Sequence, residues 1–460
     1  MGNEERMAVP LLIALSYVVI AFSVAFLLIY AIRHYVFGFS RLRIEVPKDV
    51  MELTGFHMPR VTVLVPMHNE ERVAADILQA LVDCDYDWDK LEIIPVNDRS
   101  TDNTRSIVDG FARKFPFIHP YHRTEGAGGK PAALVEACER AAGEILILFD
   151  ADYVPGRAIL KMLVAPFADP ETGAVMGRVV PHNIGDSLLA GLLSLERSAG
   201  YQAARQSRYN LGFTAQFGGT VGGVRASALQ AVGGWNPESL TEDTDLTFAL
   251  LLNGWKTAYV NRAECFEEVP RSWSVRKRQL SRWVTGHTEC LHNYWPELMR
   301  SRFLTGWEKL DAVLLLAMYW TAPMVVLGWI ASLLLFFIPE AHQTPLLPLA
   351  LAFLGYQLFA NQATFLEIGA VALLDGTRVG TLLMPLNLLN FFANTGAICN
   401  ALRKYYWNRF WGSGGDGWYK THRTRLSNGG PNGHFFGGAH AASAAERSAW
   451  GLYHAQAPGD

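Results

Sequence analysis

Two carboxylates end an apolar run in the first third of the chain. Residues 145–149 are all apolar and lie between Gly143 and Pro155, which predicts a short strand buried on both faces. Asp150 and Asp152 follow this strand directly. Buried carboxylates are costly unless a cation meets them, and ligands of open α/β sheets bind at the carboxyl ends of the strands. The pair therefore predicts a divalent-cation site that substrate phosphates complete, with a solvated turn as the alternative for Asp-x-Asp alone.

The residues before this pair alternate between strand-forming and helix-forming segments. Strands are expected at 61–66 and 91–96, and helices at 69–82, 101 onward and 130–142. This alternation predicts an α/β domain with a parallel, doubly wound sheet. Asp98 follows the second strand, so it would lie at the same sheet edge as Asp150 and Asp152.

The composition allows more than one domain and excludes one class of partner. The chain has 460 residues, 50% of them hydrophobic, and a formal net charge of −3. It lacks the bulk basicity of a nucleic-acid-binding protein, so no nucleic-acid partner is expected. The five cysteines form no Cys-x-x-Cys pair and are expected to be buried thiols in a reducing compartment.

A series of short motifs follows the same order as in a known enzyme family. In chain order the motifs are Val65–Glu71, Asn97–Asp102, Gly129–Leu134, Asp150–Asp152, Gly233–Asn236, Leu240–Leu246, Gln279–Trp283 and Trp418–Thr421. The series resembles glycosyltransferase family 2, and within it the membrane-embedded processive branch of cellulose, chitin, hyaluronan and poly-N-acetylglucosamine synthases. The resemblance covers residues 60–300 closely and implies a GT-A-type, Rossmann-like domain.

The resemblance implies a UDP-sugar donor held at the strand ends. Asp98 and Asp150 would bind the uridine and ribose side, and Lys130 would help to hold the nucleotide. Asp152, together with Asp150, would hold Mg²⁺ or Mn²⁺ on the diphosphate, whose charge must be compensated as it leaves. A solvated cap residue is the alternative for Lys130.

The same resemblance implies an inverting transfer with Asp243 as general base. A carboxylate within hydrogen-bond reach would take the proton of the acceptor hydroxyl as that hydroxyl attacks the anomeric carbon. Glu242 is expected to contact the substrate. A compatible structural reading is that Thr241 caps a helix whose first turn carries acidic residues.

Residues 271–295 predict a basic, tryptophan-bearing amphipathic helix in the membrane interface. Gln279, Arg282 and Trp283 fit Gln-x-x-Arg-Trp and share one helical face, and all three are expected to bind substrate. By the resemblance, Arg282 would compensate the departing diphosphate and Trp283 would stack on the acceptor sugar. Arginines that reach toward the interface explain the remaining basic residues.

The residues 7–30 are almost wholly apolar and predict a signal-anchor transmembrane helix, with a buried core helix as the alternative. Basic residues follow it, so the catalytic domain is expected in the cytoplasm and the protein in the plasma (inner) membrane. Membrane lipids are therefore expected partners.

Three later segments are each long enough to span: 312–338, 346–374 and 379–402. Asn and Gln within them suit either helix–helix hydrogen bonds or a passage for a glycan or headgroup. Three crossings would place the basic residues after 402 outside, against the positive-inside rule. One segment is therefore expected to be interfacial or re-entrant, and Glu367 makes the second a candidate.

The glycine-rich stretch 412–417 precedes Trp418, Lys420 and Thr421. In the synthases that the sequence resembles, the corresponding segment is a gating loop over the nucleotide, so these three residues are expected to bind substrate. A tail that contacts anionic lipid is the alternative. The chain then divides into a signal anchor (1–45), a GT-A domain (46–267), interfacial helices (268–310), transmembrane segments (311–402), a gating segment (403–426) and a disordered tail (427–460).

These features together favour an integral membrane, inverting glycosyltransferase. The expected product is a β-linked polysaccharide, extended processively from a UDP-sugar, with an accessory export subunit as a further possible partner. The alternative enzyme is a β-glycosyl diacylglycerol synthase, which takes a lipid acceptor. A non-catalytic membrane scaffold is the third reading, and the intact acidic motifs argue against it.

Overall fold

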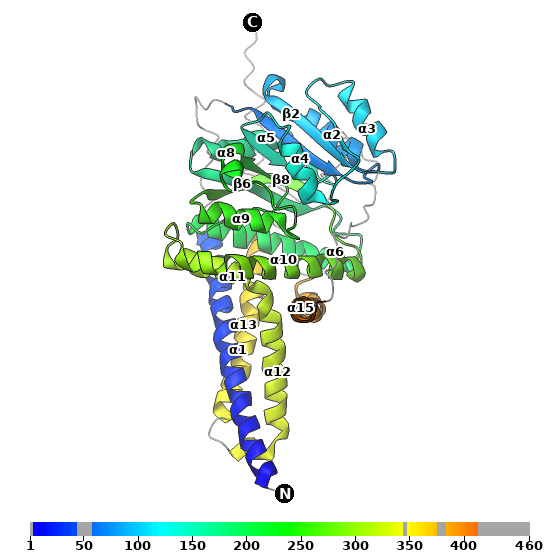
Figure 1. The fold of residues 1–460 in the computed structure, drawn as a ribbon. Helices are drawn as coiled ribbons and strands as arrows, with labels where there is room; N and C mark the ends of the chain where they lie inside the picture. Colours follow the sequence, from blue (N-terminus) through cyan, green and yellow to red (C-terminus); the bar gives the residue numbers. More distant parts are fainter. Residues whose placement is uncertain (1–2, 44–57, 344–346, 375–382, 413–460) are drawn as a thin grey trace.

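The computed structural model describes residues 3–43, 58–343, 347–374 and 383–412 (Figure 1). A sheet domain with covering helices forms one end of the molecule. A layer of long helices lies beneath it, and a bundle of α1 (Asn3–Arg43), α12 (Thr321–Phe337) and α13 (Leu347–Leu374) extends from that layer. The predicted tail (427–460) and most of the predicted gating segment lie outside the described residues.

The domain is built on one eight-stranded sheet in the order β3-β2-β1-β4-β7-β6-β8-β5. Its strands are β1 (Val61–Met67), β2 (Leu91–Asp98), β3 (Tyr121–Arg123), β4 (Ile145–Leu148), β5 (Val154–Pro155), β6 (Thr172–Pro181), β7 (Gly222–Arg225) and β8 (Lys256–Glu267). The prediction of a parallel sheet holds for β3-β2-β1-β4 and for β6-β8. It is wrong for the whole sheet, because β7 lies antiparallel between β4 and β6 and β5 is antiparallel to β8.

Alternating side chains on the strands build two cores, one on each face of the sheet. Val63 and Val65 pack with α2 (Ala74–Val82) and α5 (Ile159–Val164) on one face, whereas Leu64 packs with α4 (Lys130–Cys138) and α9 (Glu242–Leu252) on the other. Because both faces are covered, the central strands consist mainly of apolar residues. The covering helices are α2 (Ala74–Val82), α3 (Thr104–Ala112), α4 (Lys130–Cys138), α5 (Ile159–Val164), α6 (Leu188–Ser198), α7 (Gln206–Asn210), α8 (Ala226–Ala231) and α9 (Glu242–Leu252).

Two local predictions need correction. The helix expected over 130–142 ends at Cys138; residues 139–140 form a turn, and residues 141–143 have no regular structure before β4. Thr241 occupies the N-cap position of α9, but its side chain makes no capping hydrogen bond. The acids of the first turn of α9 are present as expected.

A layer of helices lies beneath the sheet domain (Figure 1). The predicted amphipathic helix is α10 (Trp273–Arg300), and α11 (Gly306–Leu316) follows it after a short turn. Thr305 and Glu308 form a capping box that starts α11, because each side chain bonds the backbone of the other. The predicted spanning segment 312–338 is not one helix. It begins within α11, continues through a short 3₁₀ helix at Met318–Trp320, and then forms α12 (Thr321–Phe337).

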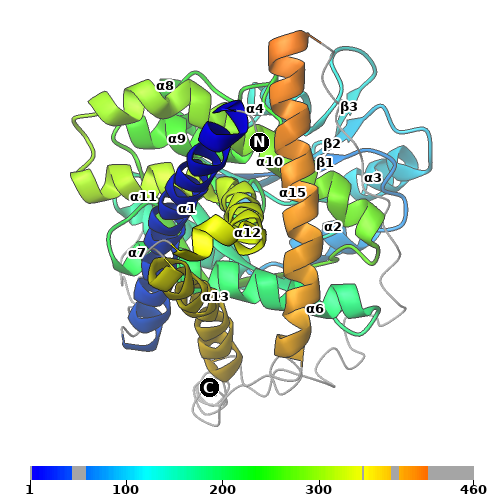
Figure 2. The ribbon, with the colours of Figure 1, turned by 90° about the horizontal axis from the view of Figure 1, so that it is seen from below.

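The bundle consists of α1 (Asn3–Arg43), α12 and α13 (Leu347–Leu374), which run side by side (Figures 1 and 2). By length and apolar composition alone, two helical stretches of the described residues could cross a membrane, Ala8–Arg43 and Met318–Phe337.

The last described helix, α15 (Asn387–Trp411), lies across the end of the bundle next to α10 (Figures 1 and 2). Of the three segments predicted to span, 379–402 is therefore the one that does not run with the bundle. Glu367 had made 346–374 the candidate for an interfacial or re-entrant segment. Glu367 instead lies buried on α13, where its Oε2 is 2.5 Å from His34 Nδ1 of α1. A buried carboxylate with such a partner is compatible with a helix inside the bundle.

Candidate active site

One cavity of about 1430 Å³ joins the sheet edge to the helices beneath it. Asp98, Asp150 and Asp152 line it at the strand ends, and Asp243 lines it at the start of α9. The cavity continues between α10 and α15 to residues of the bundle, including Leu27, Val325 and Phe391. The structure thus brings most of the predicted site residues into one space, together with apolar side chains that the sequence analysis had not linked to the site.

Lys130 lies between carboxylates at the start of α4. Its Nζ is 2.6 Å from Asp150 Oδ1 and 3.6 Å from Glu242 Oε1, and it donates to the Gly219 carbonyl at 2.7 Å. Burial, the largest single effect, opposes the charge on Lys130, but Asp150 and Glu242 together outweigh it and raise the pKa of the amine. Lys130 is therefore a charged member of the site and not a solvated cap.

Glu242 is buried beside this amine. Burial raises the pKa of Glu242, while the charge of Lys130 opposes that effect. The sequence analysis expected Glu242 to contact substrate; in the structure its carboxylate faces Lys130. A positive charge held between Asp150 and Glu242 is suited to a diphosphate.

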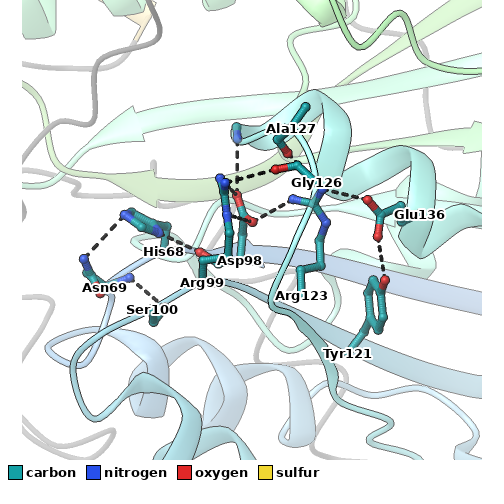
Figure 3. A network of polar contacts seen from close by, with 11 residues as sticks. His68, Asn69, Asp98, Arg99, Ser100, Tyr121, Arg123, Gly126, Ala127 and Glu136 are labelled. Atoms are coloured by element: carbon teal, nitrogen blue, oxygen red, sulfur yellow. Dashed lines mark hydrogen bonds and ion pairs between the residues drawn. The ribbon is translucent and has the colours of Figure 1, made fainter.

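Asp98 is the centre of a polar network (Figure 3). Its carboxylate accepts hydrogen bonds from Arg99 Nε at 2.9 Å, from Arg123 Nη1 at 2.7 Å and from the Gly129 amide at 3.2 Å. Arg123 also donates to the Ala127 carbonyl at 2.9 Å, so the network holds the turn that precedes Lys130. The role of Asp98 toward uridine stays a prediction, and the structure adds that it anchors this turn.

The outer part of this network involves Glu136. Its carboxylate accepts from Arg123 at 2.7 Å and from Tyr121 at 2.5 Å (Figure 3). These two hydrogen bonds lower the pKa of Glu136 to about 2. The network therefore depends on an ionised carboxylate.

Asp150 and Asp152 can supply two carboxylate ligands to a divalent cation whose other ligands come from the substrate and water. Both line the cavity, and no group of three His, Cys, Asp or Glu side chains that could hold a metal occurs among the residues described here. Mg²⁺ in sites of this kind is bound by one or two carboxylates, with phosphate oxygens and water in the other positions. The residues present thus fit the predicted metal, with Lys130 already paired to one oxygen of Asp150.

Asp243 lies at the cavity end of α9, and its Oδ1 accepts from the Thr244 amide at 2.7 Å. Sequence reasoning missed His287, which lies buried near Asp243 and whose pKa burial lowers. His287 Nδ1 is 3.0 Å from the Trp283 carbonyl, so a neutral imidazole would donate there and leave Nε2 as an acceptor. His287 falls four residues after Trp283, and this spacing was the available sequence signal.

Helix α10 contributes Gln279, Arg282 and Trp283 to the cavity wall. Arg282 Nη1 donates to the Leu240 carbonyl at 3.1 Å, which connects α10 to the segment before Asp243. The Trp283 ring lies 5.1 Å from the Arg197 guanidinium and 5.2 Å from that of Arg276. The stacking of Trp283 on a sugar was predicted without these cation–π contacts. The contact with Arg197 could not be read from local sequence, because Arg197 belongs to α6.

Gln279 accepts from Arg276 Nη1 at 3.0 Å. Its predicted contact with substrate remains a prediction, as do those of the other residues of the motif. Trp418, Lys420 and Thr421 lie outside the described residues.

Residues 59–286 match the family model described as "Glycosyltransferase like family 2". The chain is 34% identical to "Probable glycosyltransferase YdaM" of Bacillus subtilis over 50% of its own length and 56% of the relative. It is 32% identical to "Beta-monoglucosyldiacylglycerol synthase" of Synechocystis over 58% of its own length and 55% of the relative. The chain thus spans little more than half the length of these curated relatives.

A solved mannosyltransferase from Pyrobaculum calidifontis, in complex with GDP-Man and Mn²⁺, is similar in structure. The TM-score is 0.55 at 23% identity, and the match covers 79% of this chain and 98% of the other. This likeness shows the shared fold, a GT-A-like mixed α/β fold. None of these relatives supports an accessory export subunit.

Proposed function

We propose that this chain, whose residues 59–286 form a glycosyltransferase family 2 domain, transfers a hexosyl group from a nucleotide sugar to the hydroxyl of a membrane lipid. The cavity carries the proposal, because it extends from Asp152 and Asp243 to the apolar side chains of Leu27, Val325 and Phe391. A lipid could place its headgroup beside the carboxylates and its chains against these side chains. The diacylglycerol-glucosylating relatives support the same acceptor.

The donor would bind at the strand ends. Asp150 and Asp152 would hold a divalent metal, which when bound would neutralise the diphosphate as it leaves. Lys130 supplies a fixed positive charge in the same place. The nucleotide-sugar and Mn²⁺ complex of the Pyrobaculum enzyme supports this class of donor and cofactor, and UDP is the nucleotide that the motifs imply.

Asp243 would act as the general base. The acceptor hydroxyl would lose its proton to this carboxylate while its oxygen attacks the anomeric carbon and the bond to the diphosphate breaks. A single displacement of this kind inverts the anomeric configuration and needs no second nucleophile. Arg282 would hold the preceding segment in place through the Leu240 carbonyl.

The course of α15 supports a membrane arrangement with an even number of C-terminal crossings. If α12 and α13 cross and α15 lies along the surface, Arg403, Lys404 and Arg409 return to the side of the catalytic domain. That arrangement satisfies the positive-inside rule, which three crossings would violate. The proposed location is therefore the inner membrane, with the domain in the cytoplasm.

A β-linked polysaccharide is the second candidate product. The Gln279–Arg282–Trp283 face lines the same cavity and fits the motif of the processive synthases that the sequence resembles. The polymer candidate does not account for the apolar part of the cavity at Leu27, Val325 and Phe391, whereas a lipid acceptor does. We therefore favour a lipid acceptor. The assay must distinguish synthesis of a glycolipid from extension of a polymer.

The assay would use purified full-length protein in vesicles with diacylglycerol, Mg²⁺ and radiolabelled UDP-glucose, UDP-N-acetylglucosamine or UDP-galactose. We expect label in a chloroform-soluble glycolipid. Label in an insoluble or size-excluded polymer would assign the second candidate instead. No transfer from any nucleotide sugar, together with no hydrolysis of the donor, would indicate a non-catalytic scaffold.

A further inference from the structure

We propose that Glu196, Asn390 and Asn394 form a subsite for the neutral, hydroxyl-bearing headgroup of the acceptor lipid. The inference rests on the proposed function and adds to it the place where the acceptor binds. All three residues line the cavity described above, yet none belongs to the motifs that carry the family resemblance.

The three side chains come from two helices that lie far apart in the sequence. Glu196 on α6 pairs through Oε1 with Arg276 of α10. Its Oε2 accepts from Asn390 Nδ2 at 3.3 Å and from Asn394 Nδ2 at 3.4 Å, both on α15. The Glu196 side chain is 37% exposed, and because it lines the cavity, a ligand there can reach it.

The bonds to the two asparagines are suited to exchange with a ligand. They are longer than the usual N–H···O distance of about 2.9–3.0 Å, so little binding free energy is lost when a ligand hydroxyl replaces one of these bonds. Burial is the largest effect on Glu196 and raises its pKa, but Arg276 and Arg197 outweigh it and the pKa is lowered. The carboxylate is therefore ionised and accepts hydrogen bonds.

The donors and acceptors of this cluster match a hydroxylated, uncharged group. A hydroxyl can donate to the Glu196 carboxylate and accept from an asparagine amide at the same time. The charges are balanced, because Arg276 pairs with Glu196 and Arg197 Nε lies 2.7 Å from Glu267. The Glu196 carboxylate would repel an anionic headgroup, so a neutral lipid is favoured.

The position of the cluster fits an acceptor. Tyr319, Glu196 and Asp243 line the same cavity, so the cluster and the proposed base open onto one space. Next to Asn390 on α15, Phe391 packs with Leu27 and Val325 in an apolar cluster that lines the same cavity. A lipid can thus contact the polar cluster with its headgroup and the apolar cluster with its acyl chains.

The test measures binding of a diacylglycerol with a fluorescent acyl chain to full-length protein in detergent, by anisotropy. Asn394→Ala and Glu196→Gln should each weaken binding about tenfold, the usual loss for one hydrogen bond to a charged group. Gln79→Ala, which removes an exposed amide on α2 far from the cavity, is the control and should bind as wild type does. Glu196→Gln tests the carboxylate. If Glu196→Gln does not fold, Asn394→Ala still tests the subsite.

Two further measurements separate this inference from the proposed function. The KM for diacylglycerol should rise in Asn394→Ala and stay at the wild-type value in the Gln79→Ala control. Unchanged lipid binding and unchanged KM in a protein that glycosylates diacylglycerol would overturn the subsite alone. A wild-type chain that binds the lipid but never glycosylates it would instead refute the proposed function.

A free glycan offers the same hydroxyl chemistry and is distinguished by competition. Cellotetraose at millimolar concentration should leave the labelled lipid bound. Displacement of the lipid by cellotetraose in wild type, lost in Asn394→Ala, would assign the cluster to a glycan and overturn the lipid assignment.

Discussion

Replacement of Gly286 by alanine should separate α10 from the segment that carries the proposed base. A Cβ at Gly286 would lie 2.3 Å from Thr241 Oγ1 and 2.8 Å from Thr241 Cβ, against 3.4 Å or more for an ordinary contact. Thr241 is buried and immediately precedes Glu242 and Asp243. One of the two elements must therefore move by about 1 Å, the scale at which misplacement of reacting groups costs about 100-fold in rate.

The stability of the variant follows from two opposing effects. Overpacking at a buried contact costs about 1–3 kcal/mol, whereas alanine in place of glycine in a helix gains about 1 kcal/mol. Gly286→Ala should therefore lower the free energy of unfolding by about 0–2 kcal/mol. Gly396→Ala on α15 is the matched control, because a Cβ there meets nothing within 4 Å and only the helical gain remains.

The assay compares transfer rate and thermal midpoint for both variants and for Gly286→Ala combined with Thr241→Ala. We expect a transfer loss of about 10- to 100-fold for Gly286→Ala, none for Gly396→Ala, and partial recovery in the double variant, which lacks Oγ1 and Cγ2. Wild-type transfer and an increased thermal midpoint for Gly286→Ala would refute the packing argument. Equal losses in the single and double variants would show that the effect does not pass through Thr241.

Three more predictions concern the carboxylates. Asp152→Asn should remove metal-dependent transfer while the thermal midpoint stays near that of wild type, and transfer that still responds to added Mg²⁺ or Mn²⁺ would contradict its role as a ligand. Asp243→Asn should bind UDP normally, measured by calorimetry, but lose transfer by about 10²–10⁴-fold; a parallel loss of UDP affinity would make it a binding residue. Because Glu136 has a depressed pKa of about 2, its ionic contacts stabilise the fold above its unfolded pKa near 4.5 and are lost as the pH falls toward 2. The thermal midpoint of Glu136→Gln should thus lie below that of wild type at pH 7 and approach it at pH 3, and a gap independent of pH would exclude this linkage.

Local sequence determined the part of the fold that holds the donor. The apolar runs of β1, β2 and β4 and the turn residues after them were sufficient to predict strands that end on Asp98 and Asp150. Strand formation and its period of two residues are local properties, so a pattern of a few residues carries them. Helix α10 was predicted for the same reason, from the spacing of its basic and aromatic residues.

Tertiary structure alone decided how distant segments meet. No local pattern indicates that β7 pairs antiparallel between β4 and β6, because register between strands depends on which partner is present. Likewise no local pattern indicates that α15 packs along α10 and lies across the end of the bundle. Glu196 meets Asn390 and Asn394 across almost 200 residues of sequence, and no local pattern indicates that these polar groups share one site.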